Sequence, residues 1–187
     1  MLTDARLLTR LQAGDDASFE ALFLRHYDRV CGILYRLLGN HADAEDAAQQ
    51  VFLQLYRSPH RVRLRGEATN VAGWLYRVAV NLGYNALRSR RRRQSWLERV
   101  GRLWSNEDPG PNSGEAVDAA NRQDRVRRIL VEMKPRDARL LLLRHSGLSY
   151  KELAAALNVS AGSVGSLLTR AERAFADKYR MAYPEEG

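Results

Sequence analysis

Apolar residues recur every three or four positions along most of this chain, which is the spacing of α-helices that bury one face. In the first half, the pattern predicts helices over residues 4–12, 17–38, 42–57 and 70–92. Residues 58–70 break the pattern, and Pro59 and Gly66 mark them as a loop. No stretch alternates apolar and polar residues convincingly as a half-buried strand would. The chain is therefore predicted to be all-α.

One run without apolar residues, SNEDPGPNSG at residues 105–114, divides the helical pattern in two. Its Pro, Gly, Asn and Ser content predicts a flexible linker. We therefore expect two small helical domains, residues 1–93 and 119–187, joined by a linker over residues 94–118. Apolar residues at helical spacing within 94–104 either extend the preceding helix or form a short helix, which packs on the domain or offers a surface to a partner.

The second domain carries the helix start and stop signals of a helix-turn-helix. Pro135 starts one helix, where its missing N–H costs nothing. Ser149 and Glu152 form a capping box that starts the next helix. After a short break at residues 158–159, Ser160 is a good N-cap for a third. Two helices separated by so short a break predict a DNA-binding fold.

The last of these helices has two faces. Val164, Leu168 and Ala171 share an apolar stripe and should face the core. Hydroxyl and guanidinium groups on the opposite face suit base edges and phosphates in a major groove, although a solvated polar face would show the same pattern. The candidate duplex-reading residues are Ser166, Thr169, Arg170 and Arg173, with Leu167 on the shoulder, where it could meet a thymine methyl group.

A second candidate nucleic-acid surface lies on the helix predicted over residues 70–92. Its polar stripe mixes cations, amides and an aromatic ring, a combination that can bond an exposed base edge and stack on the base. The Arg-rich run that follows, residues 88–93, would bind phosphates without reading sequence, whereas an isolated run of this kind is usually a solvated tail. The stripe comprises Arg77, Asn81, Tyr84 and Arg88, with Trp74 on its border.

An acid-and-amide face distinguishes the helix predicted over residues 42–57. Asp43, Asp46, Gln49 and Gln50 lie outside its apolar stripe. In a chain with a net charge of +8, such a face should repel DNA, so it is either a docking surface for a protein or a solubilising face.

Composition supports a polyanionic partner, since the pI near 10.0 favours nucleic acid or an anionic membrane surface. No apolar run approaches the ~18 residues that span a bilayer, so we expect a soluble cytoplasmic protein without membrane insertion. The single Cys31 suits a reducing compartment. The four histidines are scattered and no Gly-rich phosphate loop is present, so we predict no catalytic residues, no metal site and no cofactor.

Three motifs in this order resemble the bacterial extracytoplasmic-function (ECF) sigma factors, which are two-domain initiation subunits of RNA polymerase. DAEDAAQQVFLQLY resembles the helix that docks on the beta-prime clamp helices of core polymerase. GWLYRVAVNLGYNALRSRRRR is similar to the helix that captures the melted −10 strand, and GLSYKELAAALNVSAGSVGSLLTRAERAF to the −35 helix-turn-helix. The resemblance implies core RNA polymerase, including its beta flap, and promoter DNA as partners, and an anti-sigma factor as inhibitor.

The resemblance also implies residue roles. Asp43, Asp46, Gln49 and Phe52 take docking positions, while Arg77, Asn81 and Asn85 take −10 positions beside a loop over residues 66–70 that helps to hold a flipped base. Ser166 and Arg170 take −35 positions, and Gly165 and Leu167 stand where family members often carry Lys or Arg. The alternative is a stand-alone helix-turn-helix regulator that binds duplex DNA as a dimer.

Overall fold

The structure is a computed structural model of the 187-residue chain, and it describes residues 2–64, 66, 69–101 and 115–184. These residues form helices and connecting loops without any strand, which confirms the all-α prediction. The first domain consists of α1 (Asp4–Gln12), α2 (Asp16–Leu38), α3 (His41–Arg57), the short 3₁₀ helix η1 (Pro59–Arg61) and α4 (Val71–Gly101). The second consists of α5 (Glu115–Glu132), α6 (Pro135–His145), α7 (Tyr150–Leu157) and α8 (Ala161–Ala182).

The predicted helices of the first domain agree closely with the observed ones, because strong caps set their ends. Gly39 ends α2 in the left-handed conformation at φ 73°, and Asn40 begins α3 by accepting the Ala42 N–H at 2.8 Å. The exception is α4, which continues to Gly101 instead of ending near residue 92. Of the linker predicted over residues 94–118, residues 94–101 therefore extend this helix and residues 115–118 begin α5. The part between them, with Trp104 and the run over 105–114, lies outside the described residues.

The first domain buries the apolar stripes of α2, α3 and α4 against one another. Leu22 and Leu34 of α2, Val51 of α3 and Leu75 of α4 are fully buried. Burying one such aliphatic side chain contributes about 1.5–3 kcal/mol, so these stripes fix which faces of α3 and α4 remain available for partners.

The second domain folds as its helix start and stop signals predict. Pro135 is the first residue of α6, and Ser149 and Glu152 form the predicted capping box at the start of α7. Asn158 makes the turn into α8 in the left-handed conformation at φ 55°. Leu153 of α7 and Leu168 of α8 are buried together in the core, which sets the helix-turn-helix geometry.

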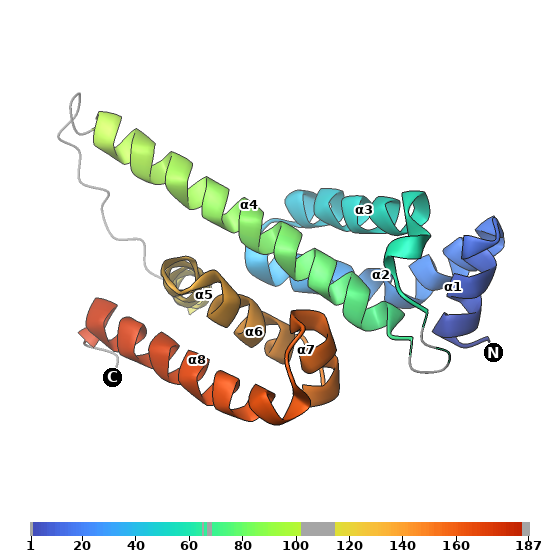
Figure 1. Ribbon diagram of the computed structural model, residues 1–187. Helices are drawn as coiled ribbons and strands as arrows, with labels where there is room; N and C mark the ends of the chain where they lie inside the picture. The colour runs from blue at the N-terminus through green and yellow to red at the C-terminus, as the bar shows by residue number, and fades with distance from the viewer. Residues whose placement is uncertain (1, 65, 67–68, 102–114, 185–187) are drawn as a thin grey trace.

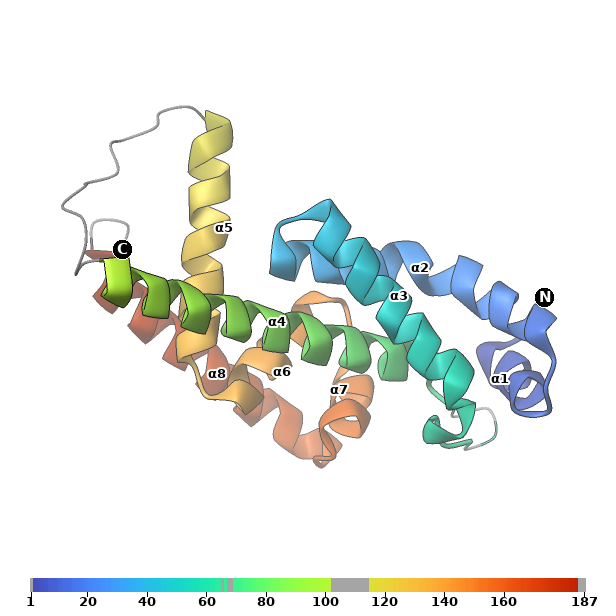
Figure 2. The ribbon, with the colours of Figure 1, turned by 90° about the horizontal axis from the view of Figure 1, so that it is seen from above.

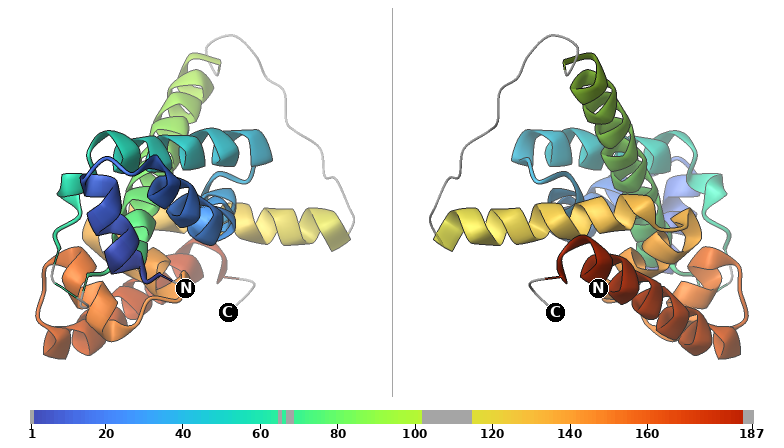
Figure 3. Two further views of the ribbon diagram at one scale, coloured as in Figure 1. Left: turned by 90° about the vertical axis from the view of Figure 1, so that its right-hand side faces the viewer. Right: turned by 90° about the vertical axis from the view of Figure 1, so that its left-hand side faces the viewer.

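The two domains pack against each other, an arrangement that the sequence did not predict. The long helix α4 lies between α1–α3 on one side and α5–α8 on the other (Figure 1). It contacts α5, α6 and α7, and buried residues of both domains belong to one continuous core cluster. The start of α5 projects away from the other helices (Figures 2 and 3). We refer to this packing as the closed arrangement.

Candidate nucleic-acid interface

The predicted docking face of α3 is exposed. Asp43, Asp46, Gln49 and Gln50 are all exposed, while Ala44, Ala48 and Val51 on the opposite side are fully buried. Phe52 is 2% exposed and packs edge-on against Phe23, with ring centroids 4.8 Å apart, so it supports the face from beneath instead of forming part of it.

The predicted reading face of α8 is also exposed. Ser166, Thr169, Arg170 and Arg173 lie at the surface and turn away from the core. Three of them bond their own helix: the Ser166 hydroxyl donates to the Ser163 carbonyl at 3.0 Å, the Thr169 hydroxyl to the Gly165 carbonyl at 3.1 Å, and the Arg170 Nε to the Ser166 carbonyl at 3.4 Å. These bonds turn both hydroxyls back onto the helix, but all four side chains remain exposed, as a major-groove reader requires.

The expectation for Leu167 is wrong in this structure. Its side chain is 9% exposed and belongs to the core cluster together with Val164 and Leu168. Because consecutive helical residues differ by about 100° in direction, Leu167 and Leu168 together widen the buried stripe beyond the width assumed from the sequence. Leu167 is therefore mainly a packing residue and presents little surface to a thymine methyl group.

The predicted −10 face of α4 is partly covered in this structure. Trp74 is 8% exposed and Tyr84 is 0% exposed. Tyr84 inserts among Ile129, Met133 and Ala138 of the second domain. A ring of this size buries a large apolar area, so the contact is a major component of the closed arrangement. Asn85 and Arg88 remain exposed, and Arg77 and Asn81 are half-buried.

Polar contacts join the same α4 face to the second domain. The Arg77 guanidinium donates to the Ala156 carbonyl of α7 at 3.4 Å. The guanidinium of Arg139 donates to the Asn85 side chain at 3.3 Å and lies over the Tyr84 ring, 5.4 Å from its centroid. The second domain thus occupies groups on α4 that were predicted to bind single-stranded DNA.

Two further arginines tie the domains together away from that face. Arg29 of α2 donates to the Ser146 carbonyl at 2.8 Å, and Arg127 of α5 donates to the Arg36 carbonyl at 3.1 Å. The Arg127 guanidinium lies directly over Gly39, where an added Cβ would approach it to 2.7 Å. The positive φ of 73° favours glycine at this position, whereas the guanidinium, at the end of a flexible side chain, could shift to admit a Cβ.

Glu152 connects the helix-turn-helix to the loop before α4. It accepts the Ser149 N–H at 2.7 Å within the capping box, and the Asn70 side-chain amide donates to it at 3.3 Å across the domain boundary. Partial burial alone would raise the pKa of Glu152, but the hydrogen bonds from Ser149 and Asn70 and the charge of Arg29 outweigh it and lower the pKa below its ordinary value. Asn70 also caps α4 by accepting the Gly73 N–H at 2.5 Å.

The loop predicted to help hold a flipped base lies only partly within the described residues. Residues 65, 67 and 68 of this loop lie outside the described part of the chain. At its end, Thr69 is 9% exposed and its hydroxyl donates to the Gly66 carbonyl at 2.7 Å. The loop's role in holding a flipped base therefore stays a prediction.

Within the described ranges, no group of three or more His, Cys, Asp or Glu side chains is placed to hold a metal ion. The clearest ion-pair cluster there is structural, since Asp4 pairs with Arg25 and lies 2.7 Å from the ring nitrogen of His26. Those partners lower the pKa of Asp4 below its ordinary value, the hydrogen bond from His26 being the largest cause. Over the same ranges, no helix combines the length and apolar character needed to cross a bilayer.

Comparison with known proteins decides between the two readings of this architecture. Residues 22–93 match Sigma-70 region 2, and residues 123–175 match Sigma-70, region 4. The ECF RNA polymerase sigma-E factor of Escherichia coli (strain K12) is 32% identical over 184 residues, which cover 95% of this chain and 94% of the relative. The chain belongs to the ECF sigma factor family. It is therefore an RNA polymerase sigma factor, and a stand-alone regulator is not favoured because both sigma regions are present.

Further similarities agree with this ECF sigma factor assignment. The RNA polymerase sigma-H factor of Pseudomonas aeruginosa is 29% identical over 178 residues, 91% of each chain. Among solved structures, CnrH in complex with the cytosolic domain of CnrY superposes with a TM-score of 0.61 at 18% identity, covering 93% of this chain and 95% of that one. RpoE from Bartonella quintana, in complex with the anti-sigma factor NepR, gives a TM-score of 0.51 at 19% identity, with coverages of 85% and 94%. These two structural matches concern the fold.

Proposed function

We propose that this sigma factor directs core RNA polymerase to promoters through three surfaces, one on each of α3, α4 and α8. The exposed acid-and-amide face of α3 docks on the beta-prime clamp helices. The α4 stripe captures the melted −10 strand, and the polar face of α8 reads the −35 duplex while the second domain approaches the beta flap. The chain contributes binding and no catalytic chemistry, and it acts with the polymerase in the cytoplasm.

The α3 face is the observation that carries this proposal. A basic chain that places two carboxylates and two amides together on one exposed helix face has a surface suited to a basic protein and unsuited to DNA. A duplex-binding regulator has no use for such a face, whereas a subunit that must attach to a large enzyme does.

The closed arrangement adds a step to this function. Because Tyr84 is fully buried and Arg77 is bonded to α7, the −10 stripe is not available until the second domain moves off α4. We infer that polymerase separates the domains by holding each at its own site, which then gives two modest DNA contacts a high effective concentration on one promoter. The free chain should accordingly bind promoter DNA weakly.

A charge reversal on α3 tests the docking step. Asp46→Lys should abolish association with purified core polymerase and programmed run-off transcription. Glu20→Lys is the matched control, because it makes the same change of charge at an exposed carboxylate of α2, outside the α3 face. If both variants associate with core polymerase as the parent chain does, the proposed docking face is refuted.

We also infer that an anti-sigma factor inhibits this chain, since both structural neighbours above are complexes with partner proteins, one of them a named anti-sigma factor. Trp96 is a candidate contact because its side chain is 58% exposed near the described end of α4. Trp104, its predicted companion, lies outside the described residues. Co-purification with the inhibitor should be lost in Trp96→Ala, and retention of the inhibitor would remove this candidate.

A further inference from the structure

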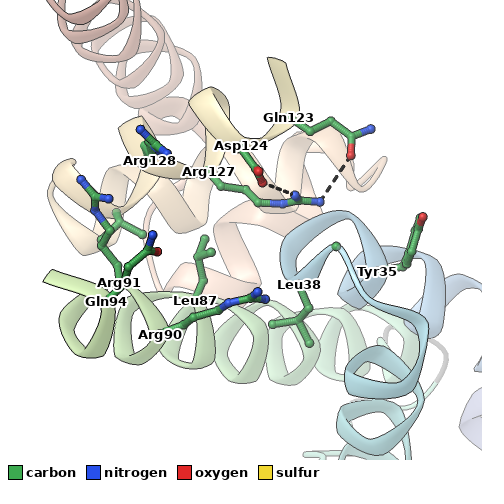
Figure 4. Close-up of a pocket in the computed structure, with 12 residues that line it drawn as sticks. Tyr35, Leu38, Leu87, Arg90, Arg91, Gln94, Gln123, Asp124, Arg127 and Arg128 are labelled. Atoms are coloured by element: carbon green, nitrogen blue, oxygen red, sulfur yellow. Dashed lines mark hydrogen bonds and ion pairs between the residues drawn. The ribbon is translucent and has the colours of Figure 1, made fainter. Parts of the chain in front are cut away.

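An arginine-lined cavity of about 450 Å³ lies where α4 and α5 face each other beside the end of α2 (Figure 4). One wall comes from the first domain and the opposite wall from the second, so the cavity exists only in the closed arrangement. Its polar lining comprises Tyr35 of α2, Arg90, Arg91 and Gln94 of α4, and Gln123, Asp124, Arg127 and Arg128 of α5.

The charges around this cavity are not balanced. Among the described residues that line it, Asp124 is the one carboxylate, and it already accepts a hydrogen bond from Arg127 at 2.8 Å. Arg90, Arg91 and Arg128 make no hydrogen bond or ion pair with the described part of the chain. Like charges face one another across the domain boundary, and this repulsion opposes closure.

We propose that this cavity binds a compact, multiply charged phosphate anion, such as pyrophosphate or the phosphate chain of a nucleotide. A guanidinium presents paired N–H donors that match phosphate oxygens, and several guanidinium groups around one cavity match several phosphates. The volume lies in the range of about 300–1,000 Å³ that small-molecule sites occupy. Leu38 and Leu87 line the same cavity, and apolar walls reduce the screening of these charges by water.

Binding of such an anion would stabilise the closed arrangement. The ligand contacts both walls, so it replaces repulsion between α4 and α5 with attraction of each to a shared anion. Since Tyr84 is buried in the same arrangement, the bound anion holds the −10 stripe covered, a consequence that rests on the proposed function. The binding itself does not depend on that function.

Isothermal titration of the full chain with sodium pyrophosphate, at about 0.15 M ionic strength, tests the binding. Arg91→Gln combined with Arg128→Gln removes one unpaired arginine from each wall. The control combines Arg92→Gln with Arg136→Gln, which removes the same charge from exposed arginines outside the cavity. We expect the first pair to weaken binding at least about tenfold and the control to change it much less.

Several results would overturn the proposal. Equal weakening of pyrophosphate binding in both double variants would mean that the anion is attracted only by the net charge of the chain. If pyrophosphate does not bind the parent chain, the cavity does not take this ligand. If pyrophosphate fails to bind while single-stranded DNA requires the Arg91 and Arg128 pair, the cavity belongs to the DNA surface instead. ATP and GTP are the second probe: tighter binding than pyrophosphate identifies a nucleotide, and equal binding identifies a simple polyphosphate.

Closure is measured separately with dyes on Leu24→Cys and Met181→Cys, positions 70% and 85% exposed, in a chain that carries Cys31→Ala. Pyrophosphate should increase the high-transfer population in single molecules, and the Arg91 and Arg128 pair should abolish the increase. No increase in the parent chain, or an equal one in both, would overturn the coupling to closure. Neither measurement uses polymerase or a promoter, so failure here is distinguishable from failure of the proposed function.

Discussion

The buried hydroxyl of Tyr84 gives a sharp test of the closed arrangement. The ring is 0% exposed, and its phenolic oxygen contacts no hydrogen-bond partner in the described part of the chain. Leaving a buried hydroxyl unpaired costs about 1–3 kcal/mol. Tyr84→Phe removes that hydroxyl while it keeps the apolar ring and its contact with the Arg139 guanidinium.

We therefore expect Tyr84→Phe to stabilise the closed chain by about 1 kcal/mol or more. For a chain of this length, 1 kcal/mol corresponds to a rise of roughly 2–4 °C in the melting midpoint. If the gain acts on closure alone, it raises the ratio of closed to open molecules about fivefold. Thermal melting followed by circular dichroism measures the first quantity, and the dye-labelled chain measures the second.

Tyr35→Phe is the matched control, because Tyr35 is 37% exposed, well above the exposure of Tyr84. Removing the Tyr35 hydroxyl should change the free energy of unfolding by no more than about 0.5 kcal/mol. A fall in the melting midpoint of Tyr84→Phe below that of the parent would show that the Tyr84 hydroxyl is bonded, and the account of this interface would then be wrong.

Three further predictions concern other parts of the molecule. Because folding lowers the pKa of Glu152, its carboxylate stabilises the folded chain above about pH 4.3, and this contribution is lost as the pH falls through the folded pKa. Glu152→Gln should therefore reduce the fall of the melting midpoint with decreasing pH, and an unchanged fall would contradict this. Arg170→Ala should weaken binding of the holoenzyme to the −35 element by about 1–3 kcal/mol, as measured by footprinting. Arg180→Ala, near the other end of α8, should leave this binding unchanged, and equal losses in both variants would place the reading face elsewhere. Gly39→Ala should lower the melting midpoint, because its φ of 73° strains an L side chain, whereas Gly32→Ala within α2, where an added Cβ meets nothing, should not. Equal shifts would contradict this.

The sequence was most informative where a side chain or cap acts locally. The ends of α2 and α3 follow from Gly39 and Asn40, and the helix-turn-helix follows from the Ser149–Glu152 capping box. These features need only residues within one turn of each other, so a single sequence displays them.

The sequence was least informative where a residue's environment comes from distant chain. Tyr84 lies on a stripe with Arg77 and Asn81 and looks like part of a polar surface, but its burial comes from Met133 and Ala138, about fifty residues later. Helical periodicity identifies faces and does not say what covers them.

The contacts that hold the domains together indicate how closure is reversed. The cross-domain bonds of Arg77, Arg139 and Asn70 are 3.3–3.4 Å long, beyond the usual N–H···O range, while those of Arg29 and Arg127 are 2.8 and 3.1 Å long and lie within it. Such a bond contributes only about 1 kcal/mol net, so the apolar contacts between the domains, with Tyr84 among them, must supply the remainder. The α3 docking face lies outside this interface and is exposed while the chain is closed. In the proposed function, polymerase binds α3 first and then separates the domains by competing for the second one, so that −10 capture depends on prior docking.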